Sequence, residues 1–363
     1  MSGPARLILV TGANGLVGRA LVAELVARKL EVCGALRRPH EMLPCCKHMV
    51  VGELNGQTDW HGALAEATQV VHLAARAHVT DETTNASLDI FSDINTAGTL
   101  NLARQSAQAG VRRFVFVSTV KVNGEGKETP YSEADEPCPE EAYAISKWEA
   151  EKGLRAIATE TGMELVVLRS PLVYGPGVGA NFLRLMQLID LGLPLPLGGM
   201  NNCRSLIYIG NLVDAIATCL TQPEAANKMY LLADAEDVST MGLIERLSEA
   251  LGKRTKLFHM PRNLLKLAGI VLNKQRAMDR LLYSLTVDSS AICQELNWVP
   301  PFSMKFGLTE TAKWYKNRIE DLKIQSVNGD VQDSEEDGKK RGVAGSNVST
   351  CTAMSCRASC SMR

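Results

Sequence analysis

The sequence predicts an α/β fold, in which a doubly wound parallel sheet is joined to a smaller C-terminal lobe. Two observations support this class. Short apolar, β-branched runs alternate with longer helical stretches through the first half of the chain, and a glycine-rich turn separates the first run from the first helix. Strands that alternate with helices are joined by right-handed crossovers, which place the strands parallel in one sheet.

The elements of the first half are expected in a regular order. The runs with strand character lie at 7–11, 31–36, 69–73, 113–118 and 164–169. The stretches with helical character lie at 16–28, 96–109 and 140–160. The first run, from Leu7 to Thr11, is apolar until its last residue, as expected of a strand that is covered on both faces.

Beyond Arg169 the regular pattern ends, because prolines and glycines interrupt the chain. We therefore predict a sheet domain at 1–175, with segments near 205–232 that return to it, and a substrate-binding lobe at 176–325. Residues 326–363 are polar and charged and lack periodic apolar residues, which predicts a disordered tail.

The composition argues against several classes of protein. Of 363 residues, 39 are Lys or Arg and 40 are Asp or Glu, so the net charge of −1 gives no electrostatic basis for binding nucleic acid. The ten cysteines include no CxxC pair, which favours reduced thiols and no metal site. We expect a cytoplasmic chain, because the N-terminal residues lack the regions of a signal peptide.

The sequence predicts no membrane-spanning helix, because no run of about 20 apolar residues occurs. The longest apolar stretch of the C-terminal half, at 264–272, is short and contains Lys266. It predicts a buried amphipathic helix, and contact with a membrane surface is the alternative.

A phosphate-binding turn is expected directly after the first strand, where Gly12, Gly15 and Gly18 are spaced as GxxGxxG. Gly12 permits a sharp turn, Gly15 lets the backbone approach a pyrophosphate, and Gly18 lets the helix pack closely on the sheet. The helix that follows offers free N–H groups and the positive end of its dipole. Because a strand precedes the turn and a helix follows it, we expect a Rossmann domain that binds a dinucleotide.

The residues after the second strand bear on which dinucleotide binds. NAD enzymes usually have an acidic residue there, whereas this chain has Arg37 and Arg38. Two guanidinium groups suit the 2′-phosphate of NADP, because arginine pairs bidentately with phosphate. The alternative, that both are solvated loop charges, has equal support, so NAD and NADP both remain open with a slight preference for NADP.

A catalytic pair is expected on the helix at 140–160, where Tyr143 and Lys147 are four residues apart and share one face. An isolated tyrosine has a pKa of about 10, and a nearby lysine and a positive nicotinamide would favour its phenolate. Tyr143 could then exchange a proton with a substrate hydroxyl or carbonyl oxygen. Thr119 ends the preceding strand, where its hydroxyl would face the ligand crevice.

These motifs together resemble the extended short-chain dehydrogenases/reductases, within the NAD-dependent epimerase/dehydratase family that acts on nucleotide sugars. The resemblance covers about residues 6–318. It includes the glycine turn, His72-Leu73-Ala74-Ala75, Asn95 to Thr99, Ser118-Thr119, Tyr143 to Lys147, and Arg169 to Gly177. It implies that Thr119, Tyr143 and Lys147 are catalytic. His72 and His78 flank the predicted cofactor crevice, where a lone histidine is more often a packing or hydrogen-bonded residue than a base.

The resemblance also implies the residues that line the two ligand sites. Cofactor contacts are expected from Gly12, Asn14, Gly15, Leu16, Val17, Gly18, Arg37, Arg38, Glu53, Leu54, Leu73, Ala74, Ala75, Asn95, Ser118, Tyr143, Lys147 and Pro171. Glu53 stands where the family usually has an adenine-contacting Asp. Substrate contacts are expected from Thr119, Asn181 and Arg204.

Two departures from the family pattern, Lys121 and Asn123, suggest a branch near the enzymes of bacterial surface polysaccharides. The main hypothesis is 4-epimerisation of a UDP-hexose or UDP-N-acetylhexosamine. The alternative is an NADPH-dependent reductase of a UDP-4-keto-6-deoxy-hexosamine. A dehydrogenase of a non-sugar alcohol and a non-catalytic dinucleotide sensor are further hypotheses, and the intact Thr119, Tyr143 and Lys147 argue against the sensor. Homodimers are common in the family.

Overall fold

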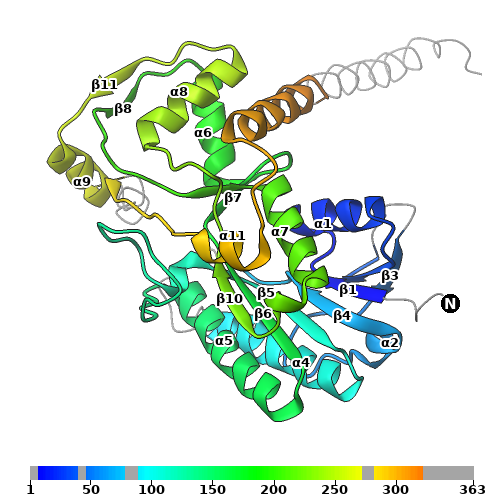
Figure 1. The fold of residues 1–363 in the computed structure, drawn as a ribbon. Helices are drawn as coiled ribbons and strands as arrows, with labels where there is room; N and C mark the ends of the chain where they lie inside the picture. The colour runs from blue at the N-terminus through cyan, green and yellow to red at the C-terminus, as the bar shows by residue number, and fades with distance from the viewer. Residues whose placement is uncertain (1–6, 40–45, 78–88, 272–281, 322–363) are drawn as a thin grey trace, which may run out of the picture. The chain divides into compact units, whose positions relative to one another are not determined.

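The computed structural model describes residues 7–39, 46–77, 89–271 and 282–321 (Figure 1). The predicted tail at 326–363 and His78 lie outside these ranges. The chain divides into two compact units, Met1–Trp314 and Tyr315–Arg363. The fold and the candidate site described below belong to the first unit, and the described residues of the second, 315–321, are helical.

A seven-stranded sheet forms the centre of the first unit, and each of its strand pairs is parallel. Its strand order is β10-β6-β5-β4-β1-β2-β3. The strands are β1 (Leu7–Thr11), β2 (Val32–Leu36), β3 (Lys47–Val50), β4 (Ala67–His72), β5 (Arg113–Thr119), β6 (Glu164–Ser170) and β10 (Lys228–Leu231). The predicted doubly wound α/β class is confirmed.

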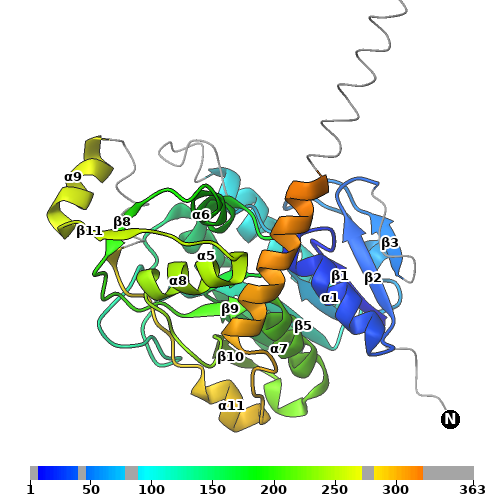
Figure 2. The same ribbon diagram turned by 90° about the horizontal axis from the view of Figure 1, so that it is seen from above.

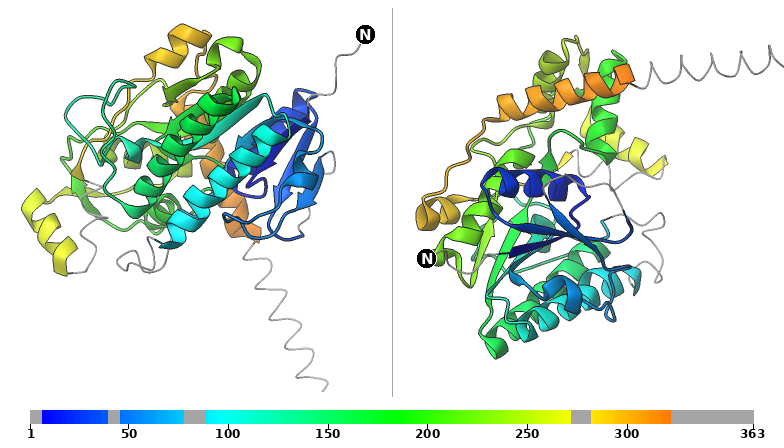
Figure 3. Two further views of the ribbon diagram at one scale, coloured as in Figure 1. Left: turned by 90° about the horizontal axis from the view of Figure 1, so that it is seen from below. Right: turned by 90° about the vertical axis from the view of Figure 1, so that its right-hand side faces the viewer.

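Helices cover both faces of this sheet (Figure 3). One face carries α1 (Leu16–Ala27) and α7 (Ile209–Thr221), which pack on each other. The other face carries α2 (His61–Leu64), α4 (Gly98–Gln108) and α5 (Ala142–Thr161). Strand β1 is buried along its whole length between these two layers, as its apolar sequence predicts.

The smaller lobe is built from short elements. They are α6 (Ala180–Asp190), β8 (Leu195–Gly198), α8 (Thr240–Leu251), β11 (Leu257–His259) and α9 (Arg262–Val271). A separate parallel pair joins β7 (Leu172–Tyr174) to β9 (Leu206–Tyr208). The remaining elements are η1 (Ser92–Ala97), η2 (Val120–Val122), η3 (Pro223–Ala225), α11 (Ser290–Leu296) and a helix over 304–314.

Two strands of the sheet were not expected from the sequence. All four residues of β3 are exposed, so its edge position left no buried apolar pattern to detect. Strand β10 is short, and it belongs to the sheet because it pairs with β6. Because β10 pairs with β6, the chain returns to the seven-stranded sheet after the loops that follow β6.

The apolar stretch at 264–272 is a helix up to Val271, but the prediction that it is buried was wrong. Leu265 is buried, whereas Leu264, Leu267 and Ile270 are more than half exposed. The reason is that only one side of α9 packs on the lobe. Among the described residues, none of the helices has both the length and the apolar character needed to cross a membrane.

Candidate active site

The order of the strands reverses between β1 and β4, which makes their carboxyl ends the switch point of the sheet. In open α/β sheets, ligands bind in the crevice outside such a point. The glycine turn follows β1, and the segment Leu73 to Ala75 follows β4. A Cβ atom on Gly12 would lie 2.9 Å from the backbone nitrogen of Ala74, so the two predicted cofactor segments are in contact.

The turn from Gly12 to Gly18 leaves no room for side chains at its two ends. Gly12 has a φ of +66°, and the N–H of Gly15 donates to its carbonyl oxygen over 2.9 Å. A Cβ on Gly18 would lie 2.1 Å from the same oxygen. The third glycine therefore lets α1 pack on the turn itself, whereas the sequence suggested packing on the sheet.

The N-terminus of α1 suits an anion. Helix α1 begins after Gly15, no side chain of the described residues caps it, and its first turn has no acidic residue. The first N–H groups of a helix have no partner within the helix, and its dipole favours negative charge there. Asn14 and Gly15 are exposed beside this end, and Leu16 and Val17 are partly exposed. These residues fit the pyrophosphate of a dinucleotide.

His72 joins the ends of β1 and β4 from inside the protein. Its Nδ1 lies 2.7 Å from Oγ1 of Thr11, and its Nε2 lies 2.8 Å from Oγ1 of Thr99. The Thr11 hydroxyl oxygen also accepts a hydrogen bond from the N–H of Ala74. Burial and the charge of Lys147 lower the pKa of His72 to about 3. His72 is therefore a neutral packing residue and not a base, as expected.

Asn95 holds the β4 end against α5. Its Oδ1 accepts from the N–H of Arg76 over 2.8 Å, and its Nδ2 donates to the carbonyl of Arg76 and to Oγ of Ser146. Ser146 lies between Tyr143 and Lys147 in the sequence. The side-chain amide that was expected to contact the cofactor thus links the cofactor segment to the catalytic helix.

The residues expected around the adenosine are mostly exposed. Arg37 and Arg38 follow β2, and a guanidinium nitrogen of Arg37 lies 3.6 Å from a carboxylate oxygen of Glu53. Leu54 packs against Gly98, where a Cβ would lie 2.9 Å from Cγ of Leu54. Gly98 is therefore needed to admit Leu54.

Tyr143 and Lys147 lie on α5, at its boundary with β5. Lys147 is 2 % exposed, and its Nζ lies 4.0 Å from the ring centroid of Phe116. Burial lowers the pKa of Lys147 to about 7, and the nearby charge of Glu151 partly opposes this effect. The Tyr143 ring makes an edge contact with Phe91 at 6.2 Å between centroids.

The sequence led us to expect that Lys147 lowers the pKa of Tyr143, but burial raises it to about 12. The reason is that the protein removes water from the phenol, which disfavours the charged phenolate. Because Lys147 is itself buried, its ammonium form is also disfavoured. Tyr143 is therefore a neutral phenol in the protein without ligands.

Ser118 and Thr119 end β5 and have different surroundings. Successive residues of a strand point to opposite faces. The Thr119 side-chain oxygen accepts from the N–H of Lys121 over 3.3 Å, and the residue remains partly exposed. Ser118 is buried and donates its hydroxyl to Oε1 of Glu151 over 2.6 Å. Of the two, Thr119 has the accessible hydroxyl.

A buried ion pair that the sequence analysis missed lies beneath this site. Arg169 Nε donates to Oε1 of Glu151 over 3.0 Å, and Nη2 donates to Oε2 over 2.7 Å. Both side chains are at most 1 % exposed. Glu151 follows Lys147 by four residues, as Lys147 follows Tyr143. The sequence signal that could have revealed the pair was Glu151 itself, a charged residue that continues the four-residue spacing of Tyr143 and Lys147 on the buried face of the helix.

Known proteins similar to this chain agree with the geometry of the site. A family model described as the NAD dependent epimerase/dehydratase family matches residues 8–233. The chain belongs to this family. Over 314 residues it is 43 % identical to a UDP-glucose 4-epimerase of Vibrio cholerae, and the alignment covers 84 % of this chain and 94 % of that protein.

Two further relatives of the epimerase/dehydratase family agree. An N-acetyl-α-D-glucosaminyl-diphospho-ditrans,octacis-undecaprenol 4-epimerase of Escherichia coli O157:H7 is 26 % identical, covering 85 % of this chain and 94 % of the relative. The solved structure of a Thermus thermophilus UDP-glucose 4-epimerase in complex with NAD is 25 % identical. It covers 85 % of this chain and 99 % of its own, with a TM-score of 0.69. The protein is thus an enzyme of the extended short-chain dehydrogenase/reductase type.

The two departures from the family pattern have structural partners. The Oδ1 of Asn123 accepts a hydrogen bond from Nη1 of Arg169 over 3.0 Å, so Asn123 extends the buried ion pair. The ammonium group of Lys121 bonds both Glu125 and Glu141. Because Glu141 directly precedes α5, Lys121 ties the loop after Thr119 to the start of the catalytic helix.

The expected substrate residues Asn181 and Arg204 lie outside the seven-stranded sheet. Asn181 is exposed in the first turn of α6. The backbone of Arg204 pairs with Val238, and its guanidinium donates to the carbonyl of Tyr283 over 3.3 Å. Pro171, expected at the cofactor, is buried directly after β6. The roles of Asn181 and Arg204 in binding substrate stay predictions.

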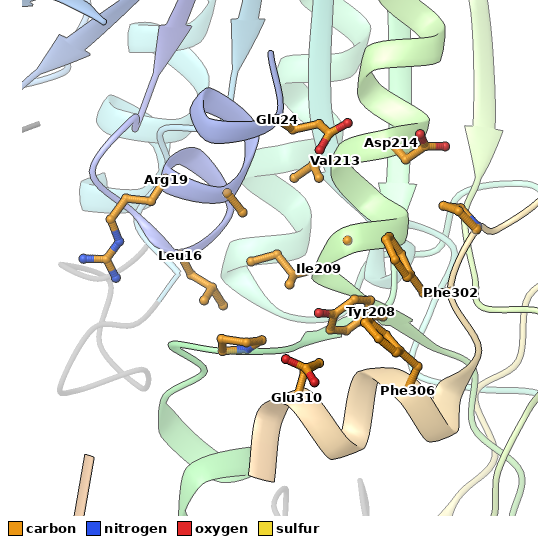
Figure 4. Close-up of a pocket in the computed structure, with 14 residues that line it drawn as sticks. Leu16, Arg19, Glu24, Tyr208, Ile209, Val213, Asp214, Phe302, Phe306 and Glu310 are labelled. Atoms are coloured by element: carbon orange, nitrogen blue, oxygen red, sulfur yellow. The ribbon is translucent and has the colours of Figure 1, made fainter. Parts of the chain in front are cut away.

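A cavity of about 580 Å³ opens between α1 and α7 (Figure 4). The rings of Tyr208, Phe302 and Phe306 pack together on one side of it. Leu16 lines it, but none of the three predicted catalytic residues does. It is therefore separate from the three predicted catalytic residues, although it adjoins the expected cofactor residue Leu16. The described residues also contain no cluster of three or more side chains suited to a metal ion.

Proposed function

We propose that this enzyme is a 4-epimerase of a UDP-hexose or UDP-N-acetylhexosamine. The observation that carries the proposal is the 43 % identity to a UDP-glucose 4-epimerase, which extends over 94 % of that protein. The candidate site supports it, because Thr119, Tyr143 and Lys147 lie on β5 and α5 next to the switch point of the sheet.

The residues of the candidate site suit a nicotinamide dinucleotide. Gly12 and Gly18 let the turn pack tightly against the β4 end and α1, and the uncapped start of α1 favours a pyrophosphate. Leu73 to Ala75 would line the crevice between the two strands, whereas the Ser118 hydroxyl is already bound to Glu151. When bound, the nicotinamide supplies hydride transfer to and from C4 of the sugar.

The proton transfer falls to Tyr143. Its phenol oxygen would take the proton from the sugar O4 as C4 is oxidised. It would return the proton to O4 after the 4-keto sugar has rotated to present its opposite face. Because its pKa is about 12 without ligands, this step requires positive charge beside the phenol. Lys147 would supply that charge when it is protonated, which its pKa of about 7 allows near and below neutral pH, and the Thr119 hydroxyl would hold the reacting oxygen in place.

The smaller lobe would hold the nucleotide part of the substrate. Asn181 offers an exposed amide, and Arg204 a guanidinium suited to a diphosphate. Binding energy from this remote part of the substrate can position C4 at the catalytic residues.

The decisive experiment incubates the purified enzyme with UDP-glucose, UDP-N-acetylglucosamine, their C4 epimers and a UDP-4-keto-6-deoxy-hexosamine, each with and without added NADPH. Product analysis should show interconversion without added NADPH, because the hydride returns to the same carbon. The same assay in D₂O should leave C4 free of deuterium. If the enzyme instead consumes NADPH with a UDP-4-keto-hexosamine and leaves the other sugars unchanged, it is the reductase and the epimerase proposal is wrong.

The identity of the dinucleotide is tested separately. The exposed pair Arg37 and Arg38 supports NADP, because two guanidinium groups can hold a 2′-phosphate. The NAD in the Thermus thermophilus relative supports NAD. Acid extraction of the purified enzyme followed by mass spectrometry identifies the retained nucleotide. Light scattering on the untreated enzyme measures its molar mass, which tests the homodimer that the family resemblance implies.

A further inference from the structure

Helix α9 turns an unusually apolar face to solvent. Leu264, Leu267, Ile270 and Val271 are 53 %, 55 %, 58 % and 76 % exposed. Their spacing of three or four residues places them on one side of the helix. Figures 1 and 2 show α9 at the outer edge of the smaller lobe, at the opposite end of the first unit from β3.

The opposite side of α9 is fixed to the lobe. Leu265 is 2 % exposed, so its side chain packs against the protein. The ammonium group of Lys266 bonds the hydroxyl of Tyr283 over 2.8 Å. The apolar face is therefore held outward on an anchored helix.

The chain around this face is strongly basic. Residues 252–271 contain no Asp or Glu, in a protein whose net charge is only −1. They contain five basic residues, Lys253, Arg254, Lys256, Arg262 and Lys266. Lys253 pairs with Asp190 at 2.9 Å, and Arg254 and Lys256 are exposed. An apolar face and a basic surrounding thus occur in one continuous segment.

We propose that α9 docks on an anionic phospholipid surface. Its leucine and isoleucine side chains would enter the boundary between headgroups and acyl chains, and the basic residues would bind lipid phosphates. A second copy of this chain fits less well, because a symmetric contact would place two basic segments against each other. The proposal is independent of the sugar substrate, since α9 holds none of the candidate catalytic residues.

Vesicle flotation of the full chain tests this interaction. The vesicles contain phosphatidylcholine alone or phosphatidylcholine mixed with phosphatidylglycerol. We expect the wild type to bind the mixed vesicles at least about tenfold more tightly, and high salt to weaken this binding. The double variant Leu267→Gln/Ile270→Gln should lose about tenfold or more in affinity, because it removes two inserted apolar side chains.

Two further variants separate the contributions. Arg254→Glu/Lys256→Glu should weaken binding to the mixed vesicles and spare any binding to phosphatidylcholine. The matched control is Val299→Gln, which changes a residue that is 72 % exposed outside this segment and should bind like the wild type. Turnover of a free nucleotide sugar should be unchanged in all of them.

Several outcomes would overturn the proposal. They are an absence of wild-type binding to the mixed vesicles, equal binding to both vesicle types, and unchanged binding of Leu267→Gln/Ile270→Gln. Light scattering without lipid provides one more contradicting outcome. A lower molar mass for Leu267→Gln/Ile270→Gln than for the wild type would mean that a second copy of the chain covers the apolar face. Loss of epimerase activity in every assay would contradict the proposed function and leave the docking result standing.

Discussion

At the residue scale, burial dominates the ionisation of the proposed catalytic pair, Tyr143 and Lys147. It raises the pKa of Tyr143 to about 12 and lowers that of Lys147 to about 7, so both charged forms are disfavoured before ligands bind. A ligand that brings positive charge to the site would shift Tyr143 toward its reactive form. If Tyr143 is the proposed base, we therefore expect it to become effective only when ligands fill the site.

The variant Tyr143→Phe tests this role with a minimal change of shape. It should lower kcat by at least about a hundredfold, because the proton acceptor is lost. The nucleotide recovered by acid extraction should equal that of the wild type, because the ring still packs on Phe91. Turnover at the wild-type rate would show that another group moves the proton.

His72 should make the protein sensitive to acid. Its pKa is about 3 in the native state and 6.5 in its ordinary state, so the unfolded chain binds more protons between these values. The free energy of unfolding should therefore fall as pH decreases from 6.5 toward 3, by up to about 1.4 kcal/mol per pH unit from this residue. Urea unfolding at several pH values measures the slope. His72→Gln should reduce it, and an identical slope in this variant would contradict the assignment.

At the element scale, α5 positions three functional groups on one face. Tyr143, Lys147 and Glu151 recur every four residues, and Glu151 anchors the helix to β5 through Ser118 and to β6 through Arg169. The arrangement sets the position of α5 against the strand that ends in Thr119. A shift of the helix would therefore change the distance between the catalytic residues.

The substitution Glu151→Gln leaves Arg169 buried without a counter-charge. We expect a loss of about 3–5 kcal/mol in the free energy of unfolding, because breaking a buried pair from one side is costly. The matched control on the same helix is Glu149→Gln, whose partner Lys152 is half exposed, and it should cost less than about 1 kcal/mol. Chemical denaturation measures both, and equal losses would argue against a special role for the buried pair.

The glycine turn offers a second matched pair. Gly18→Ala would place a Cβ 2.1 Å from the Gly12 oxygen, so α1 must move and stability should fall by about 1–3 kcal/mol. Gly15→Ala has its nearest contact at 3.1 Å and an ordinary φ of −74°, so it should fold almost normally. It should instead retain less nucleotide, because the methyl group occupies the approach to the pyrophosphate. Thermal unfolding and nucleotide extraction distinguish the two effects.

At the scale of the whole molecule, the sheet brings together residues that are far apart in the chain. The glycine turn, the β4 end, Thr119 and Pro171 lie at the carboxyl ends of β1, β4, β5 and β6. Parallel strands have their carboxyl ends on one edge of the sheet, so the parallel arrangement alone brings these four segments close together.

Ligand binding across the molecule should appear as a change in stability. UDP at about a hundred times its Kd should stabilise the native protein by about 2.7 kcal/mol, because it binds only the folded state. Differential scanning fluorimetry should show a higher Tm with UDP and no change with an equal concentration of uridine, which lacks the diphosphate. An unchanged Tm with UDP would favour a non-sugar alcohol as substrate.

The sequence alone determined the class of the sheet, five of its strands to within two residues at each end, and the three candidate catalytic residues. These features depend on local patterns: apolar runs, a glycine spacing before a helix, and the helical repeat that joins Tyr143 to Lys147. The tertiary structure decided the rest. Strands β3 and β10 depend on their neighbours in the sheet, and the Glu151–Arg169 pair depends on contact between α5 and β6.

The same distinction explains why the structure changed the expectations for α9 and for the pKa of Tyr143. The sequence showed that α9 is amphipathic but not which side the lobe covers, because burial is a property of the packed surfaces. It also showed a lysine one helical turn from Tyr143, which suggested a lowered pKa. The tertiary structure buries Lys147 fully and Tyr143 partly, and the resulting loss of hydration outweighs the attraction expected from their spacing.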